Sequence, residues 1–220
     1  EANFRLAQMY MNMMRYDDAE QLIRGFANAD PLNESAKGFL RQIESAKRML
    51  NRRREIEKRQ QETGTLTPDE ALELTSIYRA SGMQNAYQDL AMRLVADPNL
   101  PLQHVLALAN FFAQDQRVNA LIYALEQYTQ RDPNNLDAWL DLAAGYAFVR
   151  RDADAIRATR QSIQLGGDQA RDAILHDPRF QPLATNREFR ALFTRPGSGG
   201  MRPLAPLPGG ALPNLPGLAR

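Results

Sequence analysis

The sequence predicts an all-α protein assembled from repeated pairs of helices. Three observations support this prediction: an apolar face with helical spacing, the recurrence of that face at a fixed period, and a long stretch without a turn signal. The face is clearest at Trp139, Leu142, Ala143 and Tyr146, which are spaced i, i+3, i+4 and i+7 and therefore lie on one side of a helix. The small side chain of Ala143 allows a second helix to approach closely.

The period of the repeat follows from the residues that close each unit. Asp-Pro pairs end at Pro31, Pro98 and Pro133, and Gly167 ends the last unit. The last two intervals between these closing residues are nearly equal, and the first is almost twice as long. We therefore expect the long stretch without a turn to take the place of a degenerate repeat.

Together with Ala155, the face from Trp139 to Tyr146 resembles the tetratricopeptide repeat, a helix-turn-helix unit with a W-x2-L-G-x2-Y…A pattern. The length of that unit, about 34 residues, agrees with the two shorter intervals. The resemblance covers residues 1–33 and 67–167. It implies a right-handed α-solenoid of helix pairs. In this family the first helices of the pairs build a concave face that binds extended peptides or helices.

The first repeat, residues 1–33, carries Leu6, Ala7 and Tyr10 at pattern positions, and residues 34–63 then form one long charged helix. At 1.5 Å per residue this helix runs roughly 40 Å. Its first half has an apolar stripe, whereas residues 52–59 are charged nearly all round. Such a face is typical of a solvated helix, with contact to a protein or a membrane surface as the alternative.

Three further repeats occupy residues 67–167. Residues 67–70, Thr-Pro-Asp-Glu, open the first of them with a capping box and a proline at the first helical position. Pattern residues in the first two of these repeats are Leu74, Tyr78, Leu108, Ala109 and Phe112.

Two segments follow the repeats. Gly166 and Gly167 stop the last repeat helix, and residues 168–194 form capping helices that cover the apolar end of the array, one of them with a capping box at 185–188. Residues 195–220 contain six Pro and six Gly, a composition that predicts a disordered tail. We interpret this tail as a linker. A docking peptide is the alternative, because 203–206 and 213–216 have PxxP spacing.

Composition argues against several classes of function. The net charge of +1 gives no general attraction to nucleic acid or to an anionic membrane, and the longest apolar run, 105–113, is too short to span a bilayer. With no Cys and two His, a conventional zinc site lacks ligands. The common nucleotide-binding, hydrolase and protease motifs do not occur. We therefore expect no catalytic residue, no metal and no cofactor, and the compartment stays open.

A methionine-rich stretch lies in the first repeat, at Met9, Met11, Met13 and Met14. Thioether sulfurs are soft ligands that suit copper, which is one interpretation. The favoured interpretation is that some of these side chains pack in the core while the others line a pliable surface.

The resemblance implies which residues face the concave groove. Position 5 is apolar in all four repeats, and nearby amides can pair with a peptide backbone. Arg79 is the single cation among these positions, which disfavours a clamp for a partner's terminal carboxylate. An empty groove, with position 5 packed internally, is the alternative. The predicted peptide-binding residues are Phe4, Gln8, Met11, Asn12, Leu72, Ser76, Arg79, Leu106, Asn110, Gln114, Leu140 and Phe148.

The sequence thus predicts a non-enzymatic scaffold that binds an extended or helical apolar segment of a protein partner. The alternative is a soluble structural or regulatory C-terminal domain of a larger bacterial protein, for which a membrane-anchored or envelope protein is one option. The abrupt start at Glu1 and the long helix favour that alternative, and the long helix could also join copies of the chain into a homo-oligomer. We expect no nucleic-acid partner and no membrane span in this segment.

Overall fold

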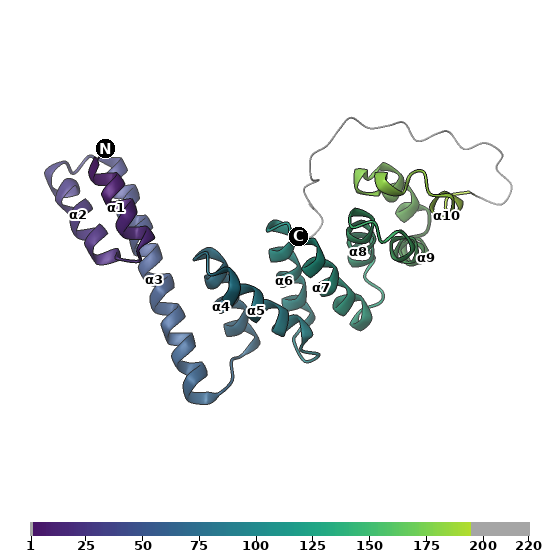
Figure 1. Ribbon diagram of the computed structural model, residues 1–220, viewed down its shortest axis with the longest axis horizontal. Coiled ribbons are helices and arrows are strands. Elements are labelled where there is room, and N and C mark those ends of the chain that lie inside the picture. Colours follow the sequence, from purple (N-terminus) through teal and green to yellow (C-terminus); the bar gives the residue numbers. More distant parts are fainter. Residues whose placement is uncertain (1, 195–220) are drawn as a thin grey trace. The chain divides into compact units, whose positions relative to one another are not determined.

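The computed structural model describes residues 2–194, and every regular element in that range is a helix (Figure 1). The all-α prediction is therefore confirmed for these residues. The described residues form two compact units, which meet in the sequence between residues 84 and 85. The predicted tail, residues 195–220, with its two PxxP segments, lies outside the described residues.

The first unit contains α1 (Ala2–Asn12), α2 (Tyr16–Ala29), α3 (Glu34–Thr63) and α4 (Pro68–Ala80). The first two helices and the first half of α3 lie side by side (Figure 1). Small and branched side chains form their common core. Because the alanines are small, the helices approach closely where alanine faces isoleucine, and these side chains are fully buried. These residues are Ala7, Ala19, Ile23, Ala36 and Ile43.

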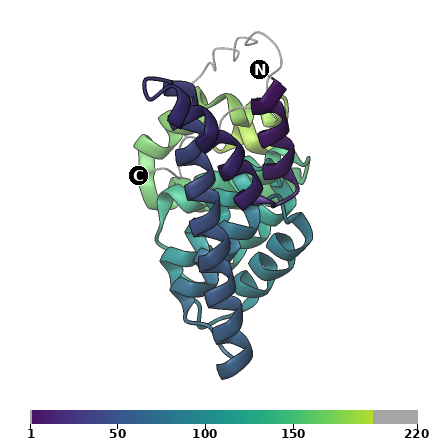
Figure 2. The same cartoon turned by 90° about the vertical axis from the view of Figure 1, so that its left-hand side faces the viewer.

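The predicted long helix is present as α3, which has 30 residues and extends well past α1 and α2 (Figure 2). It begins at a side-chain cap, where Oδ1 of Asn33 accepts a hydrogen bond from the N–H of Ala36 at 2.9 Å. It ends at Gly64, whose φ of 74° is the left-handed conformation that glycine adopts without strain.

The charged second half of α3 packs against α4 of the same chain. Nε and Nη2 of Arg52 donate to the two carboxylate oxygens of Glu73 at 2.9 and 2.8 Å. The hydroxyl of Tyr78 donates to Glu57 at 2.9 Å, and Ile56 is buried. These residues face another helix of the chain rather than only solvent, which corrects the sequence interpretation of a solvated face.

The second unit is entered through α5 (Gln84–Ala96) and continues with α6 (Leu102–Gln114), α7 (Val118–Arg131), α8 (Leu136–Phe148) and α9 (Asp152–His176). Helix α6 pairs with α7, and α8 pairs with α9. The rings of Tyr87 on α5 and Phe112 on α6 lie 6.2 Å apart. The largest buried side chains of this unit are Tyr87, Phe112, Leu108, Leu121, Leu125, Leu142, Ile174 and Leu183.

The turns that follow α1, α4, α6 and α8 have the same backbone geometry. Met14, Gly82, Gln116 and Arg150 have φ values of 58°, 69°, 57° and 61°. In every case the N–H of the next residue donates to the carbonyl five residues before it, at 2.8–2.9 Å. The last three of these turns follow one another at the length of one repeat, and the first precedes them by exactly two such lengths. The period is therefore a property of the backbone as well as of the sequence.

The residues that precede the first helix of each later pair keep the same period. They are Asn33, Thr67, Pro101 and Asn135, which are evenly spaced along the chain. The same spacing between turns would place a turn of the second repeat at Arg48. The helix α3 continues there without a break. Residues 46–50 are all strong helix formers, which favours one unbroken helix at this point. That the long helix replaces a degenerate repeat stays a prediction.

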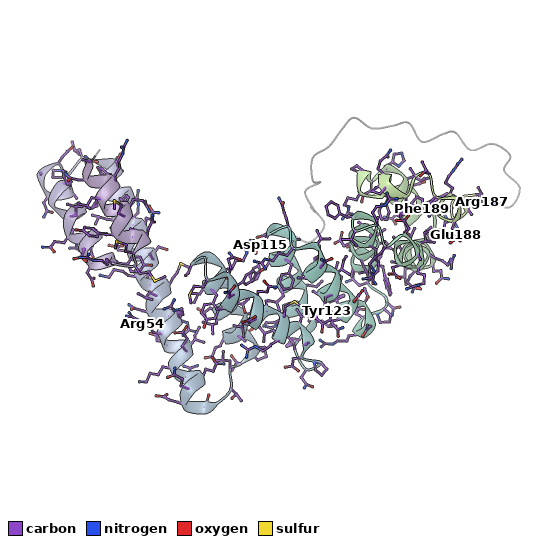
Figure 3. All side chains as sticks on the ribbon, viewed as in Figure 1. Arg54, Asp115, Tyr123, Arg187, Glu188 and Phe189 are labelled. Carbon is purple, nitrogen blue, oxygen red and sulfur yellow. The ribbon has the colours of Figure 1, made fainter. Side chains whose placement is uncertain are left out.

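The C-terminal segment closes the second unit. Gly167, with φ 56° and ψ −133°, interrupts the helical backbone of α9, at the predicted stop. A 3-10 helix, η1 (Pro178–Leu183), and α10 (Arg187–Ala191) follow. The ring of Phe189 (Figure 3) stacks on Phe180 at 6.1 Å. The cap of α10 is Asn186, which accepts from the N–H groups of residues 188 and 189, so the predicted capping box at 185–188 is wrong by one residue.

Candidate functional site

An apolar pocket of about 130 Å³ lies in the second unit, between three helices and η1. Apart from Gln116 and Arg179, its walls are hydrocarbon. The apolar lining consists of Phe112, Ala113, Val118, Leu121, Ala144, Gly145, Phe148, Pro178 and Pro182.

Two backbone features shape the helical walls of this pocket. The positive φ of Gln116 turns the chain sharply, so that Val118 begins α7 directly beside the end of α6. Gly145 lets α8 approach α7 closely, because a Cβ there would lie 3.0 Å from Cγ1 of Ile122. Phe148 is the last residue of α8, and 46% of its surface is exposed at the rim.

The remaining wall comes from η1, which polar contacts hold against α8. Nη1 of Arg179 donates to Oδ1 of Asp141 at 2.6 Å, and its Nε donates to Oδ2 of Asp177 at 2.7 Å. Nη1 of Arg150 donates to the carbonyl of Pro182 at 3.1 Å. These bonds fix the two prolines that face the pocket.

The ion pair behind this wall is buried. Asp141 is 3% exposed, and burial raises the pKa of its carboxyl above the ordinary value despite the nearby guanidinium. Burial opposes the charge of Arg179, yet its hydrogen bonds to Asp177 and Asp141 raise its pKa. Within residues 2–194, Oδ2 of Asp141 has no hydrogen-bond partner. The pair therefore positions η1 at an electrostatic cost.

The pocket suits one apolar group. An apolar cavity of about 150 Å³ accommodates benzene, so a space of this size accepts a single ring or branched aliphatic side chain. Such a group, carried by a peptide, would contact Phe148 at the rim and the proline wall.

The predicted peptide-binding residues of the first unit have mixed roles. The ring of Phe4 packs 6.2 Å from Phe26 and 5.9 Å from Phe39, and Met11 packs against the same core. Nε2 of Gln8 donates to Oδ1 of Asn12 at 3.1 Å, and both residues are exposed. On α4, Ser76 is exposed, while Leu72 and Arg79 are partly buried.

In the second unit, Leu106, Asn110 and Leu140 are partly buried, and Gln114 is exposed. Of the twelve predicted residues, Phe148 is the one that lines the pocket. Sequence reasoning missed Val118, Pro178 and Pro182. The Asp-Pro pair at 177–178 is visible in the sequence, but nothing local shows that η1 folds back onto α8.

Within residues 2–194, no group of three or more His, Asp or Glu side chains is placed to hold a metal ion. None of the helices described is both long and apolar enough to cross a bilayer.

The period of caps and turns defines a helical-repeat protein whose helix pairs are tetratricopeptide-like. No protein-family model matches the sequence, and no curated protein matches it. Among solved structures, the chain is similar to YrrB, described as a TPR protein with an unusual peptide-binding site. The two share 14% identity over 78% of this chain and 89% of that chain, with a TM-score of 0.39. The assignment of helix pairs rests on the chain's own geometry rather than on this likeness.

Proposed function

We propose that the chain is a non-enzymatic protein-interaction scaffold, and that its second unit binds an apolar segment of a protein partner. The observation that carries this proposal is the apolar pocket, with Phe148 half-exposed at its rim. Large apolar groups exposed on a soluble protein commonly mark interaction sites when they border a concavity.

The pocket would act as the anchor of a longer contact. A partner's Leu, Phe or Pro side chain would enter between Phe148 and the wall formed by Pro178 and Pro182. Burial of one such side chain stabilises a complex by roughly 1.5–3 kcal/mol, which corresponds to a weak contact unless further groups contribute. The amides of Asn110 and Gln114 are the nearest predicted groups on α6 that could pair with the partner's backbone.

A peptide-display selection on the intact chain tests this function. Wild-type protein should enrich peptides with one large apolar anchor. We expect Phe148→Lys to weaken the selected peptides at least about tenfold, because a charge at the rim would be desolvated on binding. Binding is measured by fluorescence anisotropy.

The matched control is Gln164→Lys, which adds the same charge at an exposed position of α9. It should leave affinity unchanged, and circular dichroism should show the same helix content in all three proteins. If no peptide is enriched, or if both variants bind equally, the pocket is not the binding site.

A further inference from the structure

The last described residues of the chain lie against the helix that forms one wall of the apolar pocket. The ring of Phe193 packs 5.1 Å from that of Phe189 (Figure 3), which stacks on Phe180 at 6.1 Å. Phe180 belongs to η1, between the two prolines that face the pocket. Nη1 of Arg171 donates to the carbonyl of Leu192 at 2.8 Å, which holds this end against α9. The chain beyond residue 194 therefore starts beside the pocket wall.

An apolar segment follows in the sequence within reach of that wall. Residues 203–208, Pro-Leu-Ala-Pro-Leu-Pro, form the longest run in 195–220 that has neither glycine nor a polar side chain, and we call them the proline-leucine segment. The eight residues before it include three glycines and a serine, a composition typical of linkers. A linker of this length spans up to about 30 Å. Because η1 has six residues and is about 12 Å long, the segment can reach either end of the wall.

The proline-leucine segment matches the pocket in chemistry. The pocket accepts one branched aliphatic side chain, and its walls include the rings of Phe112 and Phe148. Aromatic-lined grooves bind proline-rich segments, because proline restricts the backbone and less conformational entropy is lost on binding. Leu207 lies between two prolines. Neither the segment nor the described lining of the pocket contains a carboxylate, so the leucine would enter without burying an acidic group.

We propose that the proline-leucine segment of the same chain occupies the apolar pocket, with Leu207 as its anchor, and thereby restricts the access of a partner. This inference rests on the proposed function, because the segment and the partner would use one pocket. The contact need not be strong, since a short flexible linker gives an effective concentration of about 1 mM. A segment that binds as a free peptide with a Kd of about 0.25 mM would then weaken partner binding about fivefold.

Disulfide trapping in the full chain tests the contact directly. The chain has no Cys, so two introduced cysteines form a unique pair. Ala113 lines the pocket, and Ala205 lies in the segment beside its leucines. The variant Ala113→Cys/Ala205→Cys should form an intramolecular disulfide under mild oxidation, at a rate that does not depend on protein concentration. Adding Leu204→Ser/Leu207→Ser should slow this disulfide at least about fivefold, because the anchor is lost. Mass spectrometry measures the rate.

The matched control replaces two leucines of the same tail outside the segment. In the same cysteine variant, Leu212→Ser/Leu215→Ser makes the same chemical change and should leave the disulfide rate unaltered. Equal rates in the two serine variants would overturn the proposal. A disulfide that forms between two chains would also overturn it, because the segment would then enter the pocket of a second copy.

Partner binding supplies the second measurement. Full-length Leu204→Ser/Leu207→Ser, without cysteines, should bind a selected partner peptide about fivefold more tightly than the wild type in fluorescence anisotropy, whereas Leu212→Ser/Leu215→Ser should match the wild type. Equal affinities of all three proteins would overturn the proposal and leave the proposed function intact. A leucine-dependent disulfide in a chain that binds no partner peptide, even after Leu204→Ser/Leu207→Ser, would support docking of the segment and reject the proposed function.

Discussion

The guanidinium of Arg179 reaches from η1 to α8 and donates to Oδ1 of Asp141 over 2.6 Å. The two residues are 38 positions apart, and both are largely withdrawn from solvent. Because Oδ2 of Asp141 has no partner within the described residues, the charged form of this aspartate is poorly compensated. The contact therefore positions the pocket wall more than it stabilises the fold.

The first prediction concerns the pH dependence of this pair. Burial raises the folded-state pKa of Asp141 above the value in the unfolded chain. The unfolded state therefore releases this proton at a lower pH than the folded state does. The stabilising contribution of Asp141 should be fully present below the unfolded pKa and should be lost as pH rises through the folded pKa.

Urea unfolding of wild type and Asp141→Asn from acidic to neutral pH measures this effect. The difference in unfolding free energy between the two proteins should move in favour of the wild type as pH falls. Asp172→Asn, an exposed change on α9, should show no such trend. If the difference in unfolding free energy instead moves in favour of the wild type as pH rises, the attraction between Arg179 and the Asp141 carboxylate outweighs the cost of burying that carboxylate.

The turns supply a second prediction. Met14 has φ 58° where the equivalent turn has Gly82. A residue with a side chain pays about 1–2 kcal/mol for this conformation. Glycine avoids that cost, but it also raises the conformational entropy of the unfolded chain, which cancels part of the gain in stability. Met14→Gly should therefore stabilise the chain by about 0.5 kcal/mol, and Gly82→Ala should destabilise it by about 1 kcal/mol.

Thermal unfolding of the two single variants tests these opposite signs. Exposed Met13→Ala, one residue before the turn, controls for the loss of a methionine side chain. Destabilisation by Met14→Gly beyond that control would show that the Met14 side chain makes a contact worth more than the backbone strain.

Two helical glycines give a third prediction. A Cβ on Gly38, inside α3, would meet nothing within 4 Å, whereas one on Gly166 would lie 2.8 Å from both Ala170 Cβ and Leu136 Cδ2. Gly38→Ala should raise the free energy of unfolding by about 0.5–1 kcal/mol, because alanine favours the helix. Gly166→Ala should lower it by about 1–3 kcal/mol through overpacking.

Urea denaturation at constant m-value distinguishes these outcomes. Each variant serves as the other's control, since both make the same chemical change in a helix. Equal effects at the two positions would contradict the close packing at Gly166.

Local signals explain how much of the fold was predictable. The capping box at Thr67, the stop at Gly64 and the break at Gly167 are each encoded within a few residues, and all three are present. The long helix was predictable because no turn residue interrupts it. The role of Arg52 was not, since a charged helical face looks the same whether it meets water or a helix with complementary charges.

The site depended on contacts that are distant in sequence. The position of Phe148 in the repeat predicts a peptide-binding role for it, and in the structure its side chain is 46% exposed beside the pocket. Pro178 and Pro182 join it from η1, where Arg179 bonds to Asp141 of α8 and Arg150 bonds to the carbonyl of Pro182. No pattern around residue 178 specifies that attachment, so the pocket itself could not be predicted.

The last prediction concerns the contact that joins α3 to α4. Arg52 donates two hydrogen bonds to Glu73, and this contact lowers the pKa of the Glu73 carboxyl. The bidentate geometry favours the pair, but the two side chains are 39% and 41% exposed, so solvent screens the attraction. A double-mutant cycle of Arg52→Ala and Glu73→Ala should give a coupling energy of about 0.2–1 kcal/mol. The coupling should shrink with added salt and should be lost as pH falls through the lowered pKa of Glu73.

The matched cycle of Lys58 and Glu62, a more exposed pair within α3, should give about 0.3–0.5 kcal/mol at most. A coupling between Arg52 and Glu73 no larger than that, and insensitive to salt, would mean that Ile56 and its apolar neighbours hold α4 against α3 without help from the ion pair.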